Sequence, residues 1–382
     1  MGSVEVMLSK LCPNGVDYKL LGEVTTWDKK FNGTDKALQP KTVKFKHVSA
    51  SKLKQIAHEY GDIRLLATGV FEGYAHIDEV DESIINVGEV ISIPSGGAAD
   101  IKYHDGKFID SGNLLAVSSD STKYSLKYIW YWLLANNHHI QDRFRGSAVQ
   151  HPDMPSILKL EVPIPPLPVQ EEIVRILDSF TELIAELKAE LAARKKQYEF
   201  YREDLLKLEG VDFKALSEVA TVQNGRRVTK STMEASPGKY TVWHGGEKPM
   251  GVYSKSNCEA NTTLIANTGS IGYTQWTDEA CWCSDACTMV KSKDTDILLD
   301  KYIYYYLMDN NYTIQGYKRI AGIPTLDVDR LRKFRIPIPP IEVQEEIVEI
   351  LDTFTELIAE LTAEIALRQK QYEFYREKLL TF

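Results

Sequence analysis

The chain has 382 residues, a formal net charge of −9 and an ordinary globular composition, with 43% hydrophobic and 26% charged residues. This length predicts two or three domains, each able to bury a core of its own. The sequence has no uninterrupted apolar run of the roughly eighteen residues that a membrane helix needs, and no signal-peptide pattern, so we expect a cytoplasmic protein without a membrane segment. Five cysteines without a secretion signal argue against a disulfide framework.

The two halves of the chain contain the same series of sequence segments. Residues 12–26 match a stretch that starts at Val211. The first half then contains about 21 extra residues, and the sequences of the two halves align again from about Glu89. Apolar runs next flank a glycine turn, at 95–97 and at 268–270, which is typical of two strands joined by a turn. The aromatic-rich stretches that follow predict one helix in each half. Each half is therefore predicted to be a mixed α/β domain.

A long helix is predicted after each domain. From Gln170 and Gln344 onward, 30 of 39 aligned positions are identical. Apolar residues recur at alternating spacings of four and three, which is the heptad pattern of a coiled coil, and Arg194 and Arg368 interrupt it at the same place. At 1.5 Å per residue, each helix would span roughly 58 Å. Proline pairs before each helix predict a stiff turn into it.

Two near-identical apolar stripes in one chain predict that the helices pack on each other, antiparallel and about a pseudo-two-fold axis. The alternative is that each stripe packs only on its neighbouring domain. The two predicted helices carry most of the negative charge, −7 of the −9, so the rest of the chain is close to neutral. We expect the packing to be made by Leu177, Phe180, Ile184, Leu187, Leu191, Leu351, Phe354, Ile358, Leu361 and Ile365.

No catalytic residues and no metal site are predicted. A phosphate-binding loop of the G-x-x-x-x-G-K-[ST] type is missing, as is a glycine-rich dinucleotide or S-adenosylmethionine loop. Cys281, Cys283 and Cys287 form a C-x-C-x3-C cluster that Cys258 would have to complete, but the spacing is unusual for zinc and no histidine lies close by. We interpret these cysteines as small core residues.

Several segments resemble the DNA-specificity subunit of type I restriction–modification systems. The helices begin with PIPPLPVQEEIVRILD and PIPPIEVQEEIVEILD, and they end with RKKQYEFYREDLL and RQKQYEFYREKLL. The resemblance covers essentially the whole chain. It implies two target-recognition domains, 1–162 and 210–336, with a central conserved region at 163–209 and a C-terminal one at 337–382. Each conserved region would be a long helix, and the two would pack antiparallel, joining and separating the domains.

The same resemblance implies a non-catalytic subunit that binds double-stranded DNA, two methyltransferase (M) subunits and restriction (R) subunits. The complex would read a bipartite, asymmetric sequence, with one domain for each half-site, and methylate adenine at N6. The chain itself would need no cofactor, because the partner methyltransferase would hold S-adenosylmethionine. Two other classes stay open: an enzyme with an unrecognised active site, and a protein-binding coiled-coil scaffold without DNA specificity.

Basic residues at loop positions are the candidates for DNA contacts. One group follows a glycine at a strand-to-loop junction, and the other follows the aromatic helices at corresponding places in both halves. Arg and Lys at such positions could contact phosphates or guanine edges, although ordinary surface charge is an equal alternative for any single one. The candidates are Arg143, Arg145, Arg226, Arg227, Lys230, Lys318 and Arg319.

Overall fold

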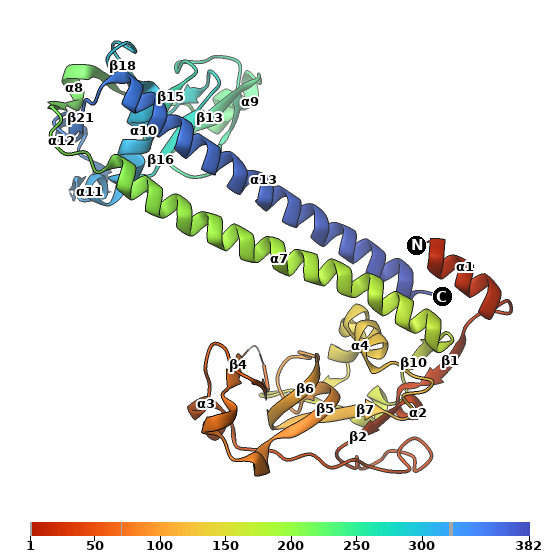
Figure 1. Cartoon of the computed structure of the whole chain (residues 1–382). Coiled ribbons are helices and arrows are strands. Elements are labelled where there is room, and N and C mark those ends of the chain that lie inside the picture. The colour runs from red at the N-terminus through yellow and green to blue at the C-terminus, as the bar shows by residue number, and fades with distance from the viewer. Residues whose placement is uncertain (1, 70, 321–323) are drawn as a thin grey trace. The chain divides into compact units, whose positions relative to one another are not determined.

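A computed structural model describes residues 2–69, 71–320 and 324–382, and the chain divides into two compact units. Unit 1 comprises Met1–Glu186 and Ile365–Phe382, and unit 2 comprises Leu187–Glu364. Each unit therefore holds one α/β domain together with parts of both long helices, α7 (Leu167–Leu206) and α13 (Ile341–Leu380) (Figure 1). In the part of the chain that the structure describes, no helix is long and apolar enough to cross a membrane.

Unit 1 is built on a six-stranded sheet with the order β2-β7-β5-β6-β3-β4. All neighbouring strands are antiparallel except β3 and β6, which are parallel. A second, two-stranded sheet pairs β1 (Asp17–Leu20) with β10 (Glu161–Ile164), just before the long helix. The strands of the main sheet are β2 (Thr25–Trp27), β3 (Ile63–Ala67), β4 (Glu72–Ala75), β5 (Asn86–Pro94), β6 (Lys102–Ser111) and β7 (Asn113–Ser118).

Unit 2 repeats this topology with one break. Its four-stranded sheet has the order β12-β18-β15-β16, which corresponds to β2-β7-β5-β6 of unit 1. The strand equivalent to β6 is interrupted after Thr277, so its second part, β17, joins a separate three-stranded sheet, β14-β13-β17. The strands are β12 (Ala220–Asn224), β13 (Tyr240–Trp243), β14 (Gly251–Tyr253), β15 (Thr262–Ala266), β16 (Thr274–Thr277), β17 (Trp282–Cys283) and β18 (Cys287–Ser292); β11 (Phe213–Ala215) pairs with β21 (Arg335–Pro337).

The extra residues of the first half lie mostly in the loop between β2 and α3. This loop runs from Asp28 to Ser49, whereas the equivalent loop of unit 2 runs only from Gly225 to Thr229 before α9. His47 fixes the longer loop to the sheet, because its ring nitrogens lie 2.7 Å from Asp110 and 3.1 Å from Asp28. The short helices are α3 (Ala50–Gln55) and α9 (Lys230–Ala235).

An aromatic helix fills the space between each sheet and the long helices. In unit 1, Tyr128 and Tyr131 of α4 are buried in the main core, and in unit 2 Tyr302 and Tyr305 of α10 take the same positions. The predicted aromatic helices therefore form; each ends at an asparagine, Asn136 or Asn310, and is followed by a short second helix. They are α4 (Leu126–Ala135) with α5 (Asn137–Gln141), and α10 (Asp300–Asp309) with α11 (Asn311–Gln315).

A buried glutamine connects each long helix to its aromatic helix. Gln170 of α7 is fully buried; its Nε2 donates to the carbonyl oxygens of Lys123 and Pro165, and its Oε1 accepts from the amide of Ser125. Gln344 of α13 is equally buried and makes the same three hydrogen bonds in unit 2, with Ile297 O, Pro339 O and Leu299 N. The glutamine of the repeated P-P-x-x-x-Q segment thus satisfies backbone groups that would otherwise be buried without partners.

A second repeated contact lies about two turns further along each long helix. Asp178 accepts a hydrogen bond of 2.7 Å from the Tyr131 hydroxyl and pairs with Lys127, also at 2.7 Å. In unit 2, Asp352 accepts from the Tyr305 hydroxyl and pairs with Lys301 at 3.3 Å. Burial and the neighbouring carboxylate both raise the pKa of Tyr131 and Tyr305, so these hydroxyls remain donors at neutral pH.

The long helices run antiparallel within each unit. In unit 1, the first turns of α7 share a core with Leu379 and Leu380 of α13, while Phe180 stacks on Tyr375 with ring centroids 5.3 Å apart. In unit 2, Leu206 shares a core with Ile347 and Leu351, and Tyr201 stacks on Phe354 at 5.4 Å. Early residues of one helix therefore meet late residues of the other. The alternative that each stripe packs only on its neighbouring domain is wrong, because aromatic pairs join the helices directly.

The remaining elements are short and close the units. Helix α1 (Gly2–Leu11) packs on unit 1 through the buried Val4 and is held to α7 by a hydrogen bond from Ser3 to Glu172. The others are α2 (Leu21–Val24), two 3₁₀ turns at Ile77–Glu79 and Glu82–Ile84, β8 (Phe144–Arg145), β9 (His151–Pro152), α6 (Met154–Ile157), α8 (Leu216–Val219), β19 (Lys318–Arg319), β20 (Thr325–Leu326) and α12 (Val328–Arg332).

Candidate nucleic-acid interface

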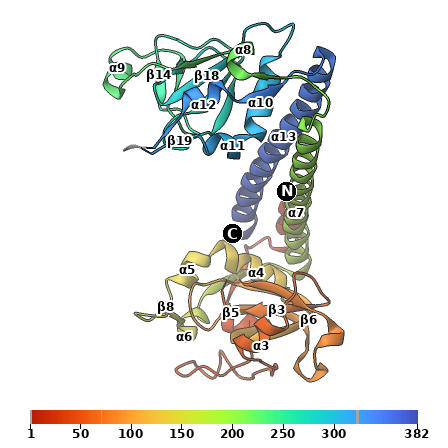
Figure 2. The same ribbon diagram turned by 90° about the vertical axis from the view of Figure 1, so that its left-hand side faces the viewer.

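In each unit, three loops from different parts of the chain meet at one end of the sheet. In unit 1 they are the loop after β2, the glycine turn after β5 and the β8–β9 hairpin, which Figure 2 shows projecting from the edge of the unit. The ring of His151 on β9 lies 2.6 Å from the Ser95 carbonyl oxygen, and Gly97 donates to the carbonyl of Gln150. Lys29, Lys30 and Asn32 line a groove of about 430 Å³ with Ser95 and His151.

The glycines of this turn have a steric role. Gly97 has a φ of +99°, which favours glycine, and a side chain on Gly96 would meet Val149 at 3.1 Å and His151 at 3.2 Å. A side chain on Gly96 would therefore require Val149 or His151 of the hairpin to shift by a few tenths of an ångström. The sequence predicted a turn here but gave no sign that a distant hairpin closes over it.

The equivalent loop of unit 2 presents Arg226 on a fixed backbone. Gly225 lies so close to the β17–β18 turn that a Cβ would come within 2.2 Å of the Ser284 carbonyl oxygen. The Arg226 amide donates to the Cys283 carbonyl, and the Arg226 carbonyl accepts from the Trp282 indole, each at 2.9 Å. The side chains of Arg226 and Arg227 are exposed. Fixed backbone and free guanidinium groups together suit contact with a ligand, because little backbone entropy is lost on binding.

Polar contacts bring the other two loops of unit 2 to the same end of the sheet. The Thr288 hydroxyl bonds the side chains of Asn224, at the end of β12, and Asn267, at the end of β15. The Asn267 carbonyl in turn accepts from the amide of Leu326 in the β19–β20 hairpin. The glycine turn at 268–270 and the hairpin thus lie beside the loop of Arg226, in the arrangement seen in unit 1.

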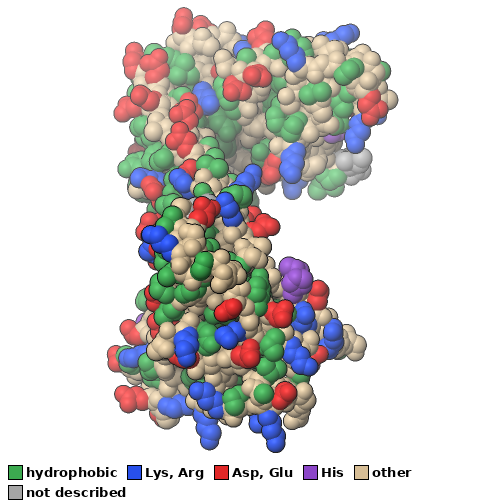
Figure 3. All heavy atoms as spheres, turned by 90° about the vertical axis from the view of Figure 1, so that its right-hand side faces the viewer, with side chains coloured by type: hydrophobic (Ala, Val, Ile, Leu, Met, Phe, Trp, Pro, Cys, Tyr) green, Lys and Arg blue, Asp and Glu red, His purple; other side chains and the backbone are tan. Residues whose placement is uncertain are grey.

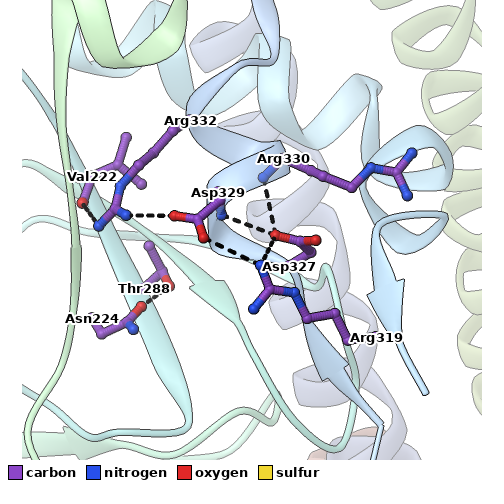
Figure 4. A network of polar contacts seen from close by, with 8 residues as sticks. All are labelled: Val222, Asn224, Thr288, Arg319, Asp327, Asp329, Arg330 and Arg332. Carbon is purple, nitrogen blue, oxygen red and sulfur yellow. Dashed lines mark hydrogen bonds and ion pairs between the residues drawn. The ribbon is translucent and has the colours of Figure 1, made fainter. Parts of the chain in front are cut away.

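Arg319 is held by carboxylates at the base of its hairpin. Its guanidinium lies 2.7 Å from Asp327 and 3.2 Å from Asp329, and Asp329 also pairs with Arg332, which donates to the Val222 carbonyl (Figure 4). The hydrogen bond from Arg319 lowers the pKa of Asp327, so this carboxylate is ionised at neutral pH. The charge of Arg319 is therefore largely compensated within the protein. Lys318 and Lys230 are exposed.

Arg143 and Arg145 contact the end of helix α5. Arg143 donates to the carbonyl of His139 and Arg145 to that of Asp142, as expected for basic residues near a helix C-terminus. Arg143 is half-buried and Arg145 is exposed. Both therefore contribute to the local structure. DNA contact by Arg143 and Arg145 stays a prediction.

Lys29 and Lys30 were not among the residues predicted from the sequence. They lie in the loop equivalent to that of Arg226 and Arg227, are exposed, and line the groove beside His151. The signal was present, because the alignment of the first strands of both halves places residues 29–32 over 224–227. On the face drawn in Figure 3, by contrast, acidic and basic side chains are intermixed, so that face offers no surface of a single sign to a polyanion.

The predicted interhelix residues differ in burial. Leu177, Ile184, Leu351 and Ile365 are buried, whereas the others are half-buried, including Phe180 and Phe354 in their aromatic stacks. The cysteine cluster of unit 2 lies in the core, with Cys258, Cys281, Cys283 and Cys287 between 0% and 4% exposed. Among residues 2–69, 71–320 and 324–382, no group of three or more His, Cys, Asp or Glu side chains is arranged to hold a metal ion.

Comparison with known proteins assigns the family. The model of the type I restriction modification DNA specificity domain matches twice, at residues 45–193 and 209–367. The chain is 33% identical over 312 residues to the Escherichia coli type I restriction enzyme EcoR124I/EcoR124II specificity subunit, covering 73% of this chain and 76% of that protein. The fold resembles the crystal structure of a type I restriction–modification S subunit from M. genitalium, with a TM-score of 0.73, 16% identity and 97% coverage of both chains. The chain therefore belongs to the family of type I restriction–modification specificity subunits, which are non-catalytic.

Proposed function

We propose that this chain reads a bipartite, asymmetric DNA sequence for a type I restriction–modification complex, with one α/β domain for each half-site. The observation that carries the proposal is the repeated three-loop arrangement, which presents exposed basic side chains in both units. The two loop sets differ in sequence, with Lys29-Lys30-Phe31-Asn32 in one and Asn224-Gly225-Arg226-Arg227 in the other. Different side chains on one scaffold are what an asymmetric site requires, because base edges are read by particular side chains.

Under this proposal, the chain supplies recognition and its partners supply the chemistry. Two methyltransferase subunits would join the complex, hold S-adenosylmethionine and methylate adenine at N6, and restriction subunits would join them to cleave DNA. Because the proposed partner is DNA, we expect the complex to act in the cytoplasm. The long helices carry most of the acid surplus, so we assign DNA contact to the loop sets and partner contact to the helices.

The test is the methylated sequence in cells that express this chain with its cognate methyltransferase. We expect a bipartite motif for the wild-type chain. Replacing Arg226 and Arg227 by Ala should relax or weaken one half of the motif, and replacing Lys29 and Lys30 by Ala should affect the other half. If any of these side chains binds a phosphate, its removal should also make DNA binding less salt-dependent. The slope of log affinity against log salt should then fall by roughly 0.9 for each phosphate that is no longer neutralised.

The matched control is Lys107→Ala, an exposed lysine on β6 outside both loop sets and both long helices. It should leave the motif and the salt dependence unchanged. A chain that directs no sequence-selective methylation in the presence of the methyltransferase would contradict the proposal and favour a protein-binding scaffold. Metal-dependent nuclease activity of the purified chain would also contradict the proposal, because it would show that the chain is itself an enzyme.

A further inference from the structure

Four of the five cysteines of the chain lie together in the core of unit 2, and all are free thiols. Unit 1 has no such cluster, because the positions that align with the last three of them hold Phe108, Asp110 and Leu114. Oxidation of these thiols would therefore act on unit 2 alone. The four residues are Cys258, Cys281, Cys283 and Cys287.

Cys258 and Cys281 lie directly opposite each other in an antiparallel β-bridge. Each amide donates to the carbonyl oxygen of the other residue, at 3.1 Å from Cys258 and at 3.0 Å from Cys281, and the two thiols also form a hydrogen bond. Residues paired in this way have Cα atoms about 5.5 Å apart, within the range of about 4.4–6.8 Å that a disulfide spans. The backbone therefore already places this pair for a disulfide.

The two thiols differ in reactivity. Cys258 lines a cavity of about 230 Å³ with Thr262, Met289 and Lys291, so a small oxidant has room beside it. The hydrogen bond with the Cys281 thiol and the charge of Lys291 lower the pKa of Cys258, whereas the same hydrogen bond raises the pKa of Cys281. A cysteine with a lowered pKa beside a second cysteine is typical of a redox-sensitive site.

The residues next to this pair support the loop of Arg226. The Arg226 amide donates to the Cys283 carbonyl, and the Trp282 indole donates to the Arg226 carbonyl, each at 2.9 Å. The Asn257 side chain in turn accepts from the Cys283 amide at 2.7 Å and donates to the Cys283 carbonyl at 2.9 Å. The neighbours of both thiols thus form the base on which the Arg226 loop lies.

A disulfide would move this base. Opposite residues that share two hydrogen bonds have Cβ atoms about 5.5 Å apart, whereas a disulfide holds them at about 3.8 Å, so the two segments would be drawn together by roughly 1–2 Å. The Arg226 loop has no slack for this movement, because a Cβ on Gly225 would already lie 2.3 Å from the Cys283 carbonyl oxygen. A shift of Cys283 therefore displaces the loop.

We propose that Cys258 and Cys281 form a reversible oxidation site for peroxide, and that their disulfide weakens the reading of one half-site, the one contacted by unit 2. The Cys258 thiolate attacks one oxygen of hydrogen peroxide and becomes a sulfenic acid, and the hydroxide that leaves takes up a proton to form water. The Cys281 sulfur then displaces the sulfenic hydroxyl group, which leaves as water with the proton of the Cys281 thiol.

In total, two thiols and one peroxide give one disulfide and two water molecules, and dithiothreitol restores the thiols while it is itself oxidised. The effect on recognition rests on the proposed function, whereas the oxidation does not.

The first measurement tests the oxidation alone, on the purified full chain treated with hydrogen peroxide and then alkylated with iodoacetamide in denaturant. Mass spectrometry should show the loss of two hydrogen atoms and a peptide pair linked through Cys258 and Cys281, which dithiothreitol removes. Cys281→Ser should stop at a sulfenic acid on Cys258, which dimedone traps. Cys12→Ser is the matched control, outside the cluster, and should oxidise as the wild type does. Absence of a link, or a link between Cys283 and Cys287 instead, overturns the oxidation site.

The second measurement compares DNA affinities of the complex of the full chain with its methyltransferase, before and after peroxide. It uses the duplex with the methylated motif and two duplexes that are each altered in one half-site. Oxidation should lower discrimination about tenfold or more, the effect of losing one base contact, at the half-site that the Arg226 and Arg227 variants affect. Discrimination at the other half-site should not change. Dithiothreitol should restore the wild type, and Cys258→Ser should not respond to peroxide.

The outcomes separate the two proposals. A disulfide that leaves discrimination at both half-sites unchanged overturns the effect on recognition and leaves the proposed function standing. A wild-type complex without sequence preference before oxidation overturns the proposed function and, with it, the effect on recognition. The oxidation site itself is decided by the masses alone.

Discussion

At the scale of single residues, the charge of Arg319 determines how the β19–β20 hairpin of unit 2 could contact DNA under the proposed function. Asp327 and Asp329 form ion pairs with its guanidinium. Asp327 is also the N-cap of α12, where its side chain accepts hydrogen bonds from the amides of Asp329 and Arg330. The lowered pKa of Asp327 means that the pair is present at neutral pH and is lost only in acid, as the pH falls through that lowered value. Under the proposed function, a phosphate contact by Arg319 at neutral pH would require its guanidinium to leave these carboxylates.

Replacing Asp327 and Asp329 by Asn should therefore raise the affinity for DNA. Asparagine caps a helix as well as aspartate does, so α12 should stay intact while Arg319 is released. In fluorescence anisotropy at pH 7, we expect tighter binding and a steeper dependence on salt, by roughly 0.9 for each additional phosphate contact. Asp294→Asn with Asp296→Asn gives the same change in net charge in the β18–α10 loop and serves as the control. An equal effect of both double variants would mean that only net charge matters.

The sequence was a partial guide to these residues. It indicated Arg226 and Arg227, because a glycine and two arginines after a strand are visible in one dimension. It could not reveal that Arg319 is compensated, since Asp327 and Asp329 approach it only when the hairpin and the α12 cap form. Lys29 and Lys30 were overlooked inside a lysine-rich insertion, although the alignment of the first strands of both halves places residues 29–32 over the loop of Arg226 and Arg227.

At the scale of elements, the repeat predicted both long helices and their antiparallel direction, but not the contacts that fix them to the domains. The helices begin at Leu167 and Ile341, because Pro163 and Ile164 still pair with β1, and β21 ends at Pro337. The partners of Gln170 and Gln344 lie 45 to 47 residues away in the chain, apart from the nearby proline carbonyls. Such long-range partners follow from the tertiary fold alone.

These two glutamines allow an internally controlled experiment. Gln170→Leu should leave the amide of Ser125 and the carbonyl of Lys123 buried without partners, at a cost of about 1–3 kcal/mol for each group. Hydrogen exchange followed by mass spectrometry should then be faster in α4 and unchanged in α10. Gln344→Leu should do the reverse. Gln369→Leu, at an exposed position of α13, should change neither helix. Equal exchange in all variants would show that the glutamines do not stabilise the helix–helix contact.

At the scale of the whole molecule, the two units share a topology but have separate cores. Unit 1 contains one six-stranded sheet. In unit 2 the strand equivalent to β6 breaks after Thr277, so the equivalent sheet is divided into a four-stranded and a three-stranded sheet. The contacts to the long helices are nonetheless the same, with a tyrosine and a lysine on one aspartate in each unit. Variation in the sheets and loops, with a constant attachment to the helices, is the pattern expected of an exchangeable recognition domain.

Exchange of residues 220–330 for the equivalent part of another family member should therefore change one half of the methylated motif only. The graft must keep Lys301 and Tyr305, which bind Asp352, and Asp309, which lies 2.9 Å from Arg202 on α7, because without them α10 would lose these polar contacts to both long helices. With these residues retained, unit 1 and its loop set are untouched, so its half-site should be read as before. The reciprocal exchange of residues 25–156 is the control and should change the other half. Methylome sequencing gives the result directly: a change in both halves, or in neither, would mean that recognition is not divided between the domains.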